Sequence, residues 1–117
     1  MKWFVLRYIF QIISGDGNYA SQFDEQLRLI QAVDAHDALQ KGEGQSENFH
    51  RPFRNCNGEL VKWEFICIAD LYEIEPPGDG SEVSSVLHEP KDMVVFLDEL
   101  KRREAFLHQS IFIENPN

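Results

Sequence analysis

The sequence ELVKWEFICIADLYEI, residues 59–74, is the stretch that decides the fold. It predicts one long β-strand, because successive side chains of a strand point to opposite faces and every second residue here is apolar. The apolar face consists of Val61, Trp63, Phe65, Cys67, Ala69 and Leu71, and the mixed face of Lys62, Glu64, Ile66, Ile68, Asp70, Tyr72 and Ile74. This pattern indicates a central strand whose mixed face is partly covered by a neighbour or by another subunit.

A second long strand is predicted at residues 2–13, KWFVLRYIFQII. Its continuous apolar face consists of Phe4, Leu6, Tyr8, Phe10 and Ile12. Since this strand matches residues 59–74 in length and character, we expect the two to be neighbours in one sheet, with their apolar faces against a layer of helix.

The polar loop at residues 14–22, SGDGNYASQ, predicts a hairpin connection. It lacks the Lys-Ser/Thr pair of a phosphate-binding loop, and Ser21 and Leu27 stand where a calcium loop beginning at Asp16 needs Gly and Glu. The strand that follows, residues 23–33, alternates imperfectly, which indicates a bulge or burial on both sides.

A short helix is predicted after Asp34, which suits an N-cap, with Asp37 placed to bond back to the helix start. Its narrow face of small residues, which lets it lie close to the sheet, consists of Ala35, Ala38, Leu39 and Gly42. We expect Gly42 and Gly44 to end this helix.

The segment from residue 42 to residue 58 is the least regular part of the pattern, but Asn57-Gly58 is a strong tight-turn signal. A short extended piece at residues 53–56 is therefore expected to pair back onto the start of the long strand.

The C-terminal part predicts a fourth strand at residues 82–88, less apolar than the others and a candidate edge, and a helix that starts at Glu89-Pro90. The apolar stripe of this helix consists of Met93, Phe96, Leu97, Leu100 and Leu107. In the tail, Ile111, Phe112 and Ile113 are too apolar to be left in water, so the tail is expected to dock on its own domain or on a second subunit.

These elements predict a single α+β domain over residues 1–117, with the sheet and first helix in 1–88, a C-terminal helix in 89–108 and a docking tail in 109–117. The fold is a four-stranded, mostly antiparallel sheet in the sequence order β-β-α-β-β-α, with both helices packed on one face. The mixed second face and the apolar tail predict a homodimer.

The charge and hydropathy of the chain argue against several classes of function. The chain has 20 acidic and 11 basic residues and a net charge of −9, which argues against a nucleic-acid partner because phosphate binding needs a concentrated basic surface. The apolar start is interrupted by Arg7 and Gln11 and no cleavage site follows, so it does not read as a signal peptide. No apolar run of about 18 residues exists to span a membrane. We expect a cytoplasmic protein without a membrane partner, with Cys56 and Cys67 as free thiols.

No motif for catalysis, metal or cofactor binding is present. The 4 histidines are scattered without metal-ligand spacing. Glu64 and Asp70 share a face but lie about 20 Å apart along an unbroken strand, beyond the range of a glycosidase-type pair. No nucleophile elbow occurs.

One weak candidate for a ligand-binding or partner-binding site remains, formed by Asp70, Tyr72 and Glu64 on the mixed face of the long strand, with Trp63 as a further interface-type aromatic residue. The alternative is that Asp70 merely pairs with Arg7 or Arg28 across the sheet.

The opening W-F-V-x-R strand, the FDEQLRLIQA segment, the NGELVKWEFICIADLYEI strand and the following DGSEVSS together resemble a bacterial family, domain of unknown function 4288, over about residues 2–85. The most specific pattern is G-x-x-V-x-W-x-F-x-x-x-x-D-L-Y, formed by Gly58, Val61, Trp63, Phe65, Asp70, Leu71 and Tyr72. The resemblance implies a small cytoplasmic bacterial domain and no catalytic residue.

The leading functional hypothesis is a small, acidic, noncatalytic binding or protein-interaction domain that homodimerises. The alternative is a small enzyme or metabolite sensor with a pocket at the dimer seam.

Overall fold

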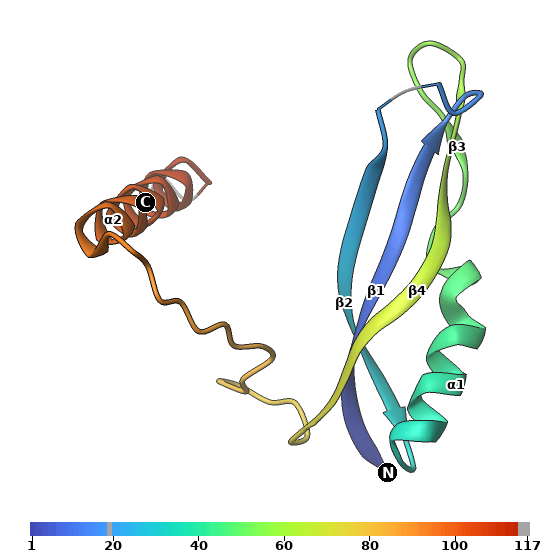
Figure 1. The fold of residues 1–117 in the computed structure, drawn as a ribbon, viewed down its shortest axis with the longest axis horizontal. Coiled ribbons are helices and arrows are strands. Elements are labelled where there is room, and N and C mark those ends of the chain that lie inside the picture. Colours follow the sequence, from blue (N-terminus) through green and yellow to red (C-terminus); the bar gives the residue numbers. More distant parts are fainter. Residues whose placement is uncertain (19, 115–117) are drawn as a thin grey trace. The chain divides into compact units, whose positions relative to one another are not determined.

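The computed structural model describes residues 1–18 and 20–114. The chain divides into two compact units, Met1–Ser84 and Ser85–Asn117. Figure 1 shows that the first unit holds the sheet and helix α1 (Ala35–Gln45), and the second holds helix α2 (Met93–Glu114). The expected packing of α2 on the same sheet face as α1 stays a prediction.

The sheet contains β1 (Lys2–Ser14), β2 (Gln22–Ala32), β3 (Phe53–Arg54) and β4 (Leu60–Ile74). Its strand order is β2-β1-β4-β3, and every neighbouring pair is antiparallel. The predicted α+β class and the order β-β-α-β-β-α are confirmed, as are the hairpin between the first two strands and the pairing of the two long strands. The tight turn before β4 also forms, with Gly58 at a φ of 76°, a left-handed conformation that favours glycine.

The fourth strand of the sheet is β3, and the strand predicted at residues 82–88 does not form. That prediction was wrong because the apolar residues Val83, Val86 and Leu87 do not alternate, so the segment has no single face to lay on a core. The short piece that pairs back from residue 53 takes its place, with Phe53 opposite Val61.

Two register shifts interrupt the pairing of β4 with β1. Arg7 lies opposite Asp70 but Tyr8 lies opposite Ile68, and Ile9 lies opposite Cys67 but Phe10 lies opposite Phe65. Ala69 and Ile66 are therefore the extra residues of two β-bulges. Between the bulges the alternation reverses, so the predicted face assignment is wrong there: Ile68 packs toward the core, and Cys67 lies on the opposite face.

By contrast, β2 pairs with β1 in one continuous register from Gln22 to Ala32. Its imperfect alternation has a different cause. Ile30 and Ala32 are buried, but the side chains that precede them on the same face are polar. The bulge considered for this strand is thus found in β4 instead.

Helix α1 begins as predicted. The Asp37 backbone N–H donates to Asp34 Oδ1 at 2.8 Å, and the Val33 N–H donates to Asp37 Oδ2 at 3.0 Å, which satisfies two otherwise free donors at the helix start. The predicted end is wrong, because the helix runs on through Gly42 and Gly44 to Gln45 and then into a 3-10 turn, η1 (Ser46–Asn48). Gly42 serves close packing instead of termination.

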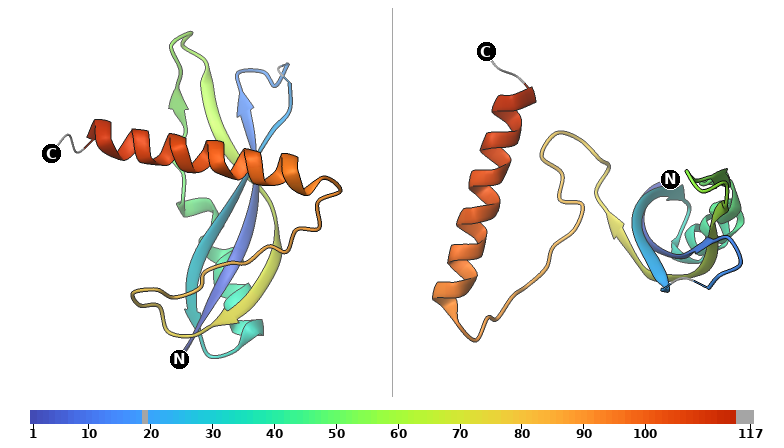
Figure 2. Two further views of the ribbon diagram at one scale, coloured as in Figure 1. Left: turned by 90° about the vertical axis from the view of Figure 1, so that its left-hand side faces the viewer. Right: turned by 90° about the horizontal axis from the view of Figure 1, so that it is seen from above.

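The core lies between the sheet and α1, and its buried residues are Phe4, Leu6, Tyr8, Phe10, Ile30, Ala32 and Ala38. The Tyr8 hydroxyl donates to the Gly42 carbonyl at 2.9 Å, so even the phenol in this core is satisfied. In the left view of Figure 2, α1 lies behind the strands, which leaves the other face of the sheet toward the viewer.

Helix α2 starts at Met93, later than the predicted Glu89-Pro90, because Asp92 is the residue that caps it: Asp92 Oδ1 accepts from the Val95 N–H at 3.1 Å. The helix also continues past the predicted end at residue 108 to Glu114, so much of the expected tail is helical. Residues 115–117 of that tail lie outside the described residues, and its docking stays a prediction.

Candidate interaction surface

The face of the sheet opposite α1 is the candidate site, and it is called the second face below. Register assigns it Trp3, Val5, Arg7, Ile9, Gln11 and Ile13 from β1, Phe23, Glu25, Leu27, Leu29 and Gln31 from β2, and Lys62, Glu64, Cys67, Asp70, Tyr72 and Ile74 from β4. Phe23 and Leu29 are 58% and 45% exposed. Exposed apolar side chains that lie among charged ones make this face a candidate for interaction.

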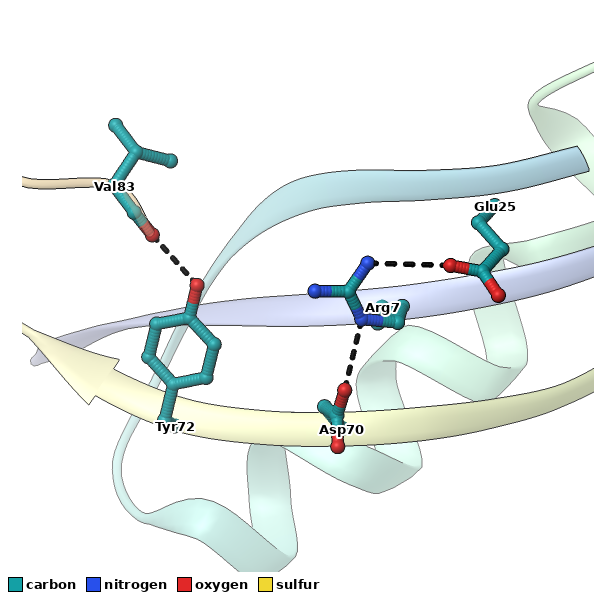
Figure 3. Close-up of polar contacts among 5 residues, drawn as sticks. All are labelled: Arg7, Glu25, Asp70, Tyr72 and Val83. Atoms are coloured by element: carbon teal, nitrogen blue, oxygen red, sulfur yellow. Dashed lines mark hydrogen bonds and ion pairs between the residues drawn. The ribbon is translucent and has the colours of Figure 1, made fainter. Parts of the chain in front are cut away.

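Arg7 occupies the centre of the second face and is neutralised there. Its Nε donates to Asp70 Oδ2 at 2.8 Å and its Nη1 lies 3.3 Å from Glu25 Oε2, as Figure 3 shows. The hydrogen bond to Asp70 raises the pKa of Arg7 above its ordinary value, with the nearby charges acting in the same direction. The alternative of an Asp70–Arg7 pair across the sheet is therefore what the structure contains.

Tyr72 lies next to Val5 on the second face. Its hydroxyl donates to the Val83 carbonyl at 2.6 Å (Figure 3), which ties the segment after β4 back to that strand. The phenol is thus engaged within the chain, and the residue is partly buried.

Glu64 and Trp63 do not join Asp70 and Tyr72 in one cluster. Glu64 is exposed on the second face opposite Gln11, four positions from Arg7 on β1 and thus about 13 Å from the Asp70 pair. Trp63 lies on the opposite face of the sheet. The four predicted residues therefore do not form one site. Asp70, Tyr72 and Glu64 lie on the second face, and Trp63 lies on the core face.

Trp63 belongs to a polar and aromatic cluster on the core face that the sequence patterns did not reveal. Its indole N–H donates to Asp24 Oδ2 at 3.1 Å, and its ring stacks on His50 with centroids 5.0 Å apart. Gln26 Nε2 donates to the same Asp24 oxygen at 2.7 Å, and Arg28 donates to Gln26 Oε1 through both Nε and Nη2. The alternating polar residues of β2 were the available signal.

The pKa of His50 lies below its ordinary value in this cluster. Burial lowers its pKa, and the positive charge of Arg28 lowers it further, against the opposite effect of Asp24. Gln26 Nε2 lies 2.9 Å from His50 Nε2, nearer than Gln26 Oε1 at 3.2 Å. Since Oε1 already accepts from Arg28, this geometry suits a neutral imidazole whose Nε2 accepts from Gln26 Nε2.

Two hollows lie on the first unit. One, of about 360 Å³, is lined by Ala35, His36, Leu39, Ile68, Ala69, Asp70 and Leu71 between α1 and β4. The other, of about 420 Å³, lies at the loop end of the sheet, and its lining mixes polar residues such as Asn55, Asn57 and Glu59 with apolar Ile12, Ile13 and Ala20. Within the described residues, no group of three or more His, Cys, Asp or Glu side chains is placed to hold a metal ion.

The fold and this surface define a small α+β protein whose antiparallel sheet is packed against a helix on one face and carries a mixture of apolar and charged side chains on its second face. The chain belongs to the family described as Domain of unknown function (DUF4288), whose profile matches residues 3–85, and the predicted family is thereby confirmed. No curated protein and no solved structure matches the chain. In the part of the chain that the structure describes, no helix is long and apolar enough to cross a membrane.

Proposed function

We propose that this protein is a noncatalytic protein-interaction domain that homodimerises and uses the second face of its sheet as the binding surface. The observation that carries the proposal is the exposure of Leu27 and Leu29 beside the neutralised Arg7, together with the exposed Phe23 about 13 Å further along β2. Such side chains gain free energy when a partner removes them from water, at about 25 cal/mol per Å² of apolar area. An internally paired arginine lowers the cost of covering the centre of the face.

The candidate binding residues support a binding surface better than a reaction centre. Asp70 is bonded to Arg7, Tyr72 to the Val83 carbonyl and Trp63 to Asp24, so each of these polar groups is already engaged within the chain. They shape and orient the surface. A catalytic acid, base or nucleophile would instead need a free group aimed at a substrate.

The charge of the chain indicates the chemistry of the partner. The net charge is −9, and Glu25, Glu64 and Asp70 lie on the second face with fewer basic residues. A protein with an apolar contact surface and a basic rim would complement this pattern and be steered toward it. We propose the bacterial cytoplasm as the location, a compartment in which Cys56 and Cys67 would remain the exposed free thiols that they are.

The alternative, a small enzyme or metabolite sensor, is favoured by one observation: the hollow of about 360 Å³ between α1 and β4, whose lining residues include Asp70 and His36. A thermal-shift screen against metals, nucleotides and metabolites separates the two functions. A ligand at 100 times its dissociation constant adds about 2.7 kcal/mol of stability. A stabilising ligand whose effect is lost in Asp70→Asn would support the sensor function, and the interaction proposal expects no such ligand.

The two cysteines provide the direct test of the binding surface. Both are exposed, but Cys67 lies on the second face and Cys56 lies in the turn before β4. A thiol-reactive benzophenone is attached to Cys67 in a Cys56→Ser chain, and to Cys56 in a Cys67→Ser chain as the matched control. We expect illumination in native cell extract to give discrete protein adducts from the Cys67 label only. Adducts of equal yield from both labels, or none from Cys67, would contradict the proposal.

A further inference from the structure

The two margins of the sheet differ in how well they can accept another strand. β2 is the outermost strand on one side, and its pairing with β1 has no bulge and no proline. On the other side, β3 pairs with only Leu60 and Val61 of β4, and beyond it the bulges at Ile66 and Ala69 disturb the strand. Bulges and very short edge strands discourage pairing, whereas a long regular edge is a template for it. The edge of β2 is therefore the accepting one.

We infer that the chain homodimerises by antiparallel pairing of β2 with β2 of a second copy, in a register centred on Gln26. This inference rests on the proposed homodimer and specifies its geometry. The two sheets would join into one, and the second faces of both copies would form one continuous surface.

Charge selects the register. When two identical strands pair antiparallel about a two-fold axis, the residue at the centre lies opposite the same residue of the second copy. A residue before the centre then lies opposite the residue equally far after the centre in the second copy. Centring on Asp24, Glu25 or Arg28 sets like charges directly opposite, which is unfavourable. Centring on Leu27 sets Asp24 opposite Ile30 and Arg28 opposite Gln26, so no unlike charges are paired. Centring on Gln26 sets Asp24 opposite Arg28 of the second copy, twice per dimer, with no like charges opposed.

The bonding within one copy leaves room for these pairs. In the described part of the chain, Asp24 accepts through Oδ2, and Arg28 donates through Nε and Nη2. Among the described residues, Asp24 Oδ1 and Arg28 Nη1 make no hydrogen bond, although the Arg28 guanidinium also lies over the Phe49 ring, 3.8 Å from its centroid. Pairing with the second copy would use these two atoms. At the end of β2, Lys41 Nζ already donates to the Gln31 carbonyl at 2.7 Å. The register centred on Gln26 pairs residues 22–30 and stops before that position.

The same register sets Phe23 opposite Leu29 of the second copy on the second face, and this pair provides the first test. In a Cys56→Ser/Cys67→Ser chain, Phe23→Cys with Leu29→Cys should oxidise to a disulfide-linked dimer. An intrachain bond is excluded because six residues of strand span about 20 Å, and a disulfide needs Cα atoms within about 7 Å. The matched control, Glu25→Cys with Leu29→Cys, would be aligned only by the register centred on Leu27. Equal or preferential linkage of the control would overturn the inferred register.

Exchanging the charges of Asp24 and Arg28 provides a second test. Its result would differ if these two residues acted only within one chain. Asp24→Arg and Arg28→Asp should each weaken the homodimer at least about tenfold, because each variant opposes like charges twice. An equimolar mixture of the two variants should restore dimers, because a mixed dimer with one copy of each variant sets unlike charges opposite each other at both pairs. Failure of the mixture to recover, with both variants shown to be folded by circular dichroism, would overturn the inference.

The mass of the unmodified chain distinguishes failure of the proposed homodimer from failure of the β2 pairing. A mass of 13.6 kDa by light scattering at micromolar concentration would reject the homodimer and with it the edge pairing. A dimeric mass without the Phe23→Cys/Leu29→Cys linkage would reject the edge pairing alone.

Discussion

At the scale of single residues, Gly42 sets how closely α1 approaches the sheet. A Cβ atom at this position would lie 2.8 Å from the Tyr8 hydroxyl and would also meet the Leu6 side chain, both buried. Gly44, further along the same helix, has nothing within 4 Å of such a Cβ. The two glycines therefore differ in packing although they share a helix.

Gly42→Ala should lower the free energy of unfolding by about 1–3 kcal/mol, the usual cost of overpacking a core. Gly44→Ala should raise it by about 0.4–1 kcal/mol, because alanine favours the helix and restricts the unfolded chain. Urea unfolding of both variants measures this. A Gly42→Ala protein as stable as the wild type would show that α1 does not rest on β1 at this point.

The state of His50 predicts a pH dependence. Burial holds its pKa below the ordinary value of 6.5, so the unfolded chain binds more protons than the folded one in mild acid. Stability contributed by neutral His50 is therefore present above about pH 6.5 and is lost as the pH falls below it. We expect His50→Gln to flatten this part of the stability profile, measured by urea unfolding between about pH 5 and 8.

The control for that measurement is His108→Gln, since His108 is exposed on α2. The profile of His108→Gln provides the reference for removing a histidine from the surface. An identical slope for wild type and His50→Gln would show that His50 is not held neutral by its surroundings.

At the scale of elements, β4 shows where simple alternation fails. Strict alternation places Ile66 and Ile68 on one face, but the bulges separate them: Ile68 packs on the core, whereas Ile66 is 48% exposed. Ile68→Ala should destabilise the protein by about 2 kcal/mol, the low end for a core Ile→Ala change. Ile66→Ala should cost less than about 0.5 kcal/mol, as for a surface change. Equal losses in thermal or urea unfolding would contradict the bulged register.

The elements that could be predicted from sequence were those fixed by local chemistry. The alternation in β1, the Asp34 cap and the Asn57-Gly58 turn each indicate their structure within a few residues of chain. The β4 bulges could not be predicted, because a bulge is defined by a partner strand distant in sequence. The same reason hid the cluster of Asp24 and His50, which are brought together by β2 and the segment after η1. The Arg7–Asp70 pair was considered as an alternative, since an arginine and an aspartate occupied mixed faces of the two long strands.

At the scale of the molecule, an acidic chain with an apolar second face is suited to association with other proteins. The packed face of the sheet is closed by α1, and Tyr8 bonds to that helix through the Gly42 carbonyl. The second face carries an arginine, Arg7, that is paired with two carboxylates, and apolar side chains that remain exposed. Binding on this face and pairing along the edge of β2 do not compete, so a dimer would present twice the contact surface of one copy.

The most direct test of this account is the mass of the purified, unmodified chain by multi-angle light scattering over a range of micromolar concentrations. The account predicts a mass approaching twice the 13.6 kDa of one chain as the concentration rises. A constant mass of 13.6 kDa across the range would contradict it.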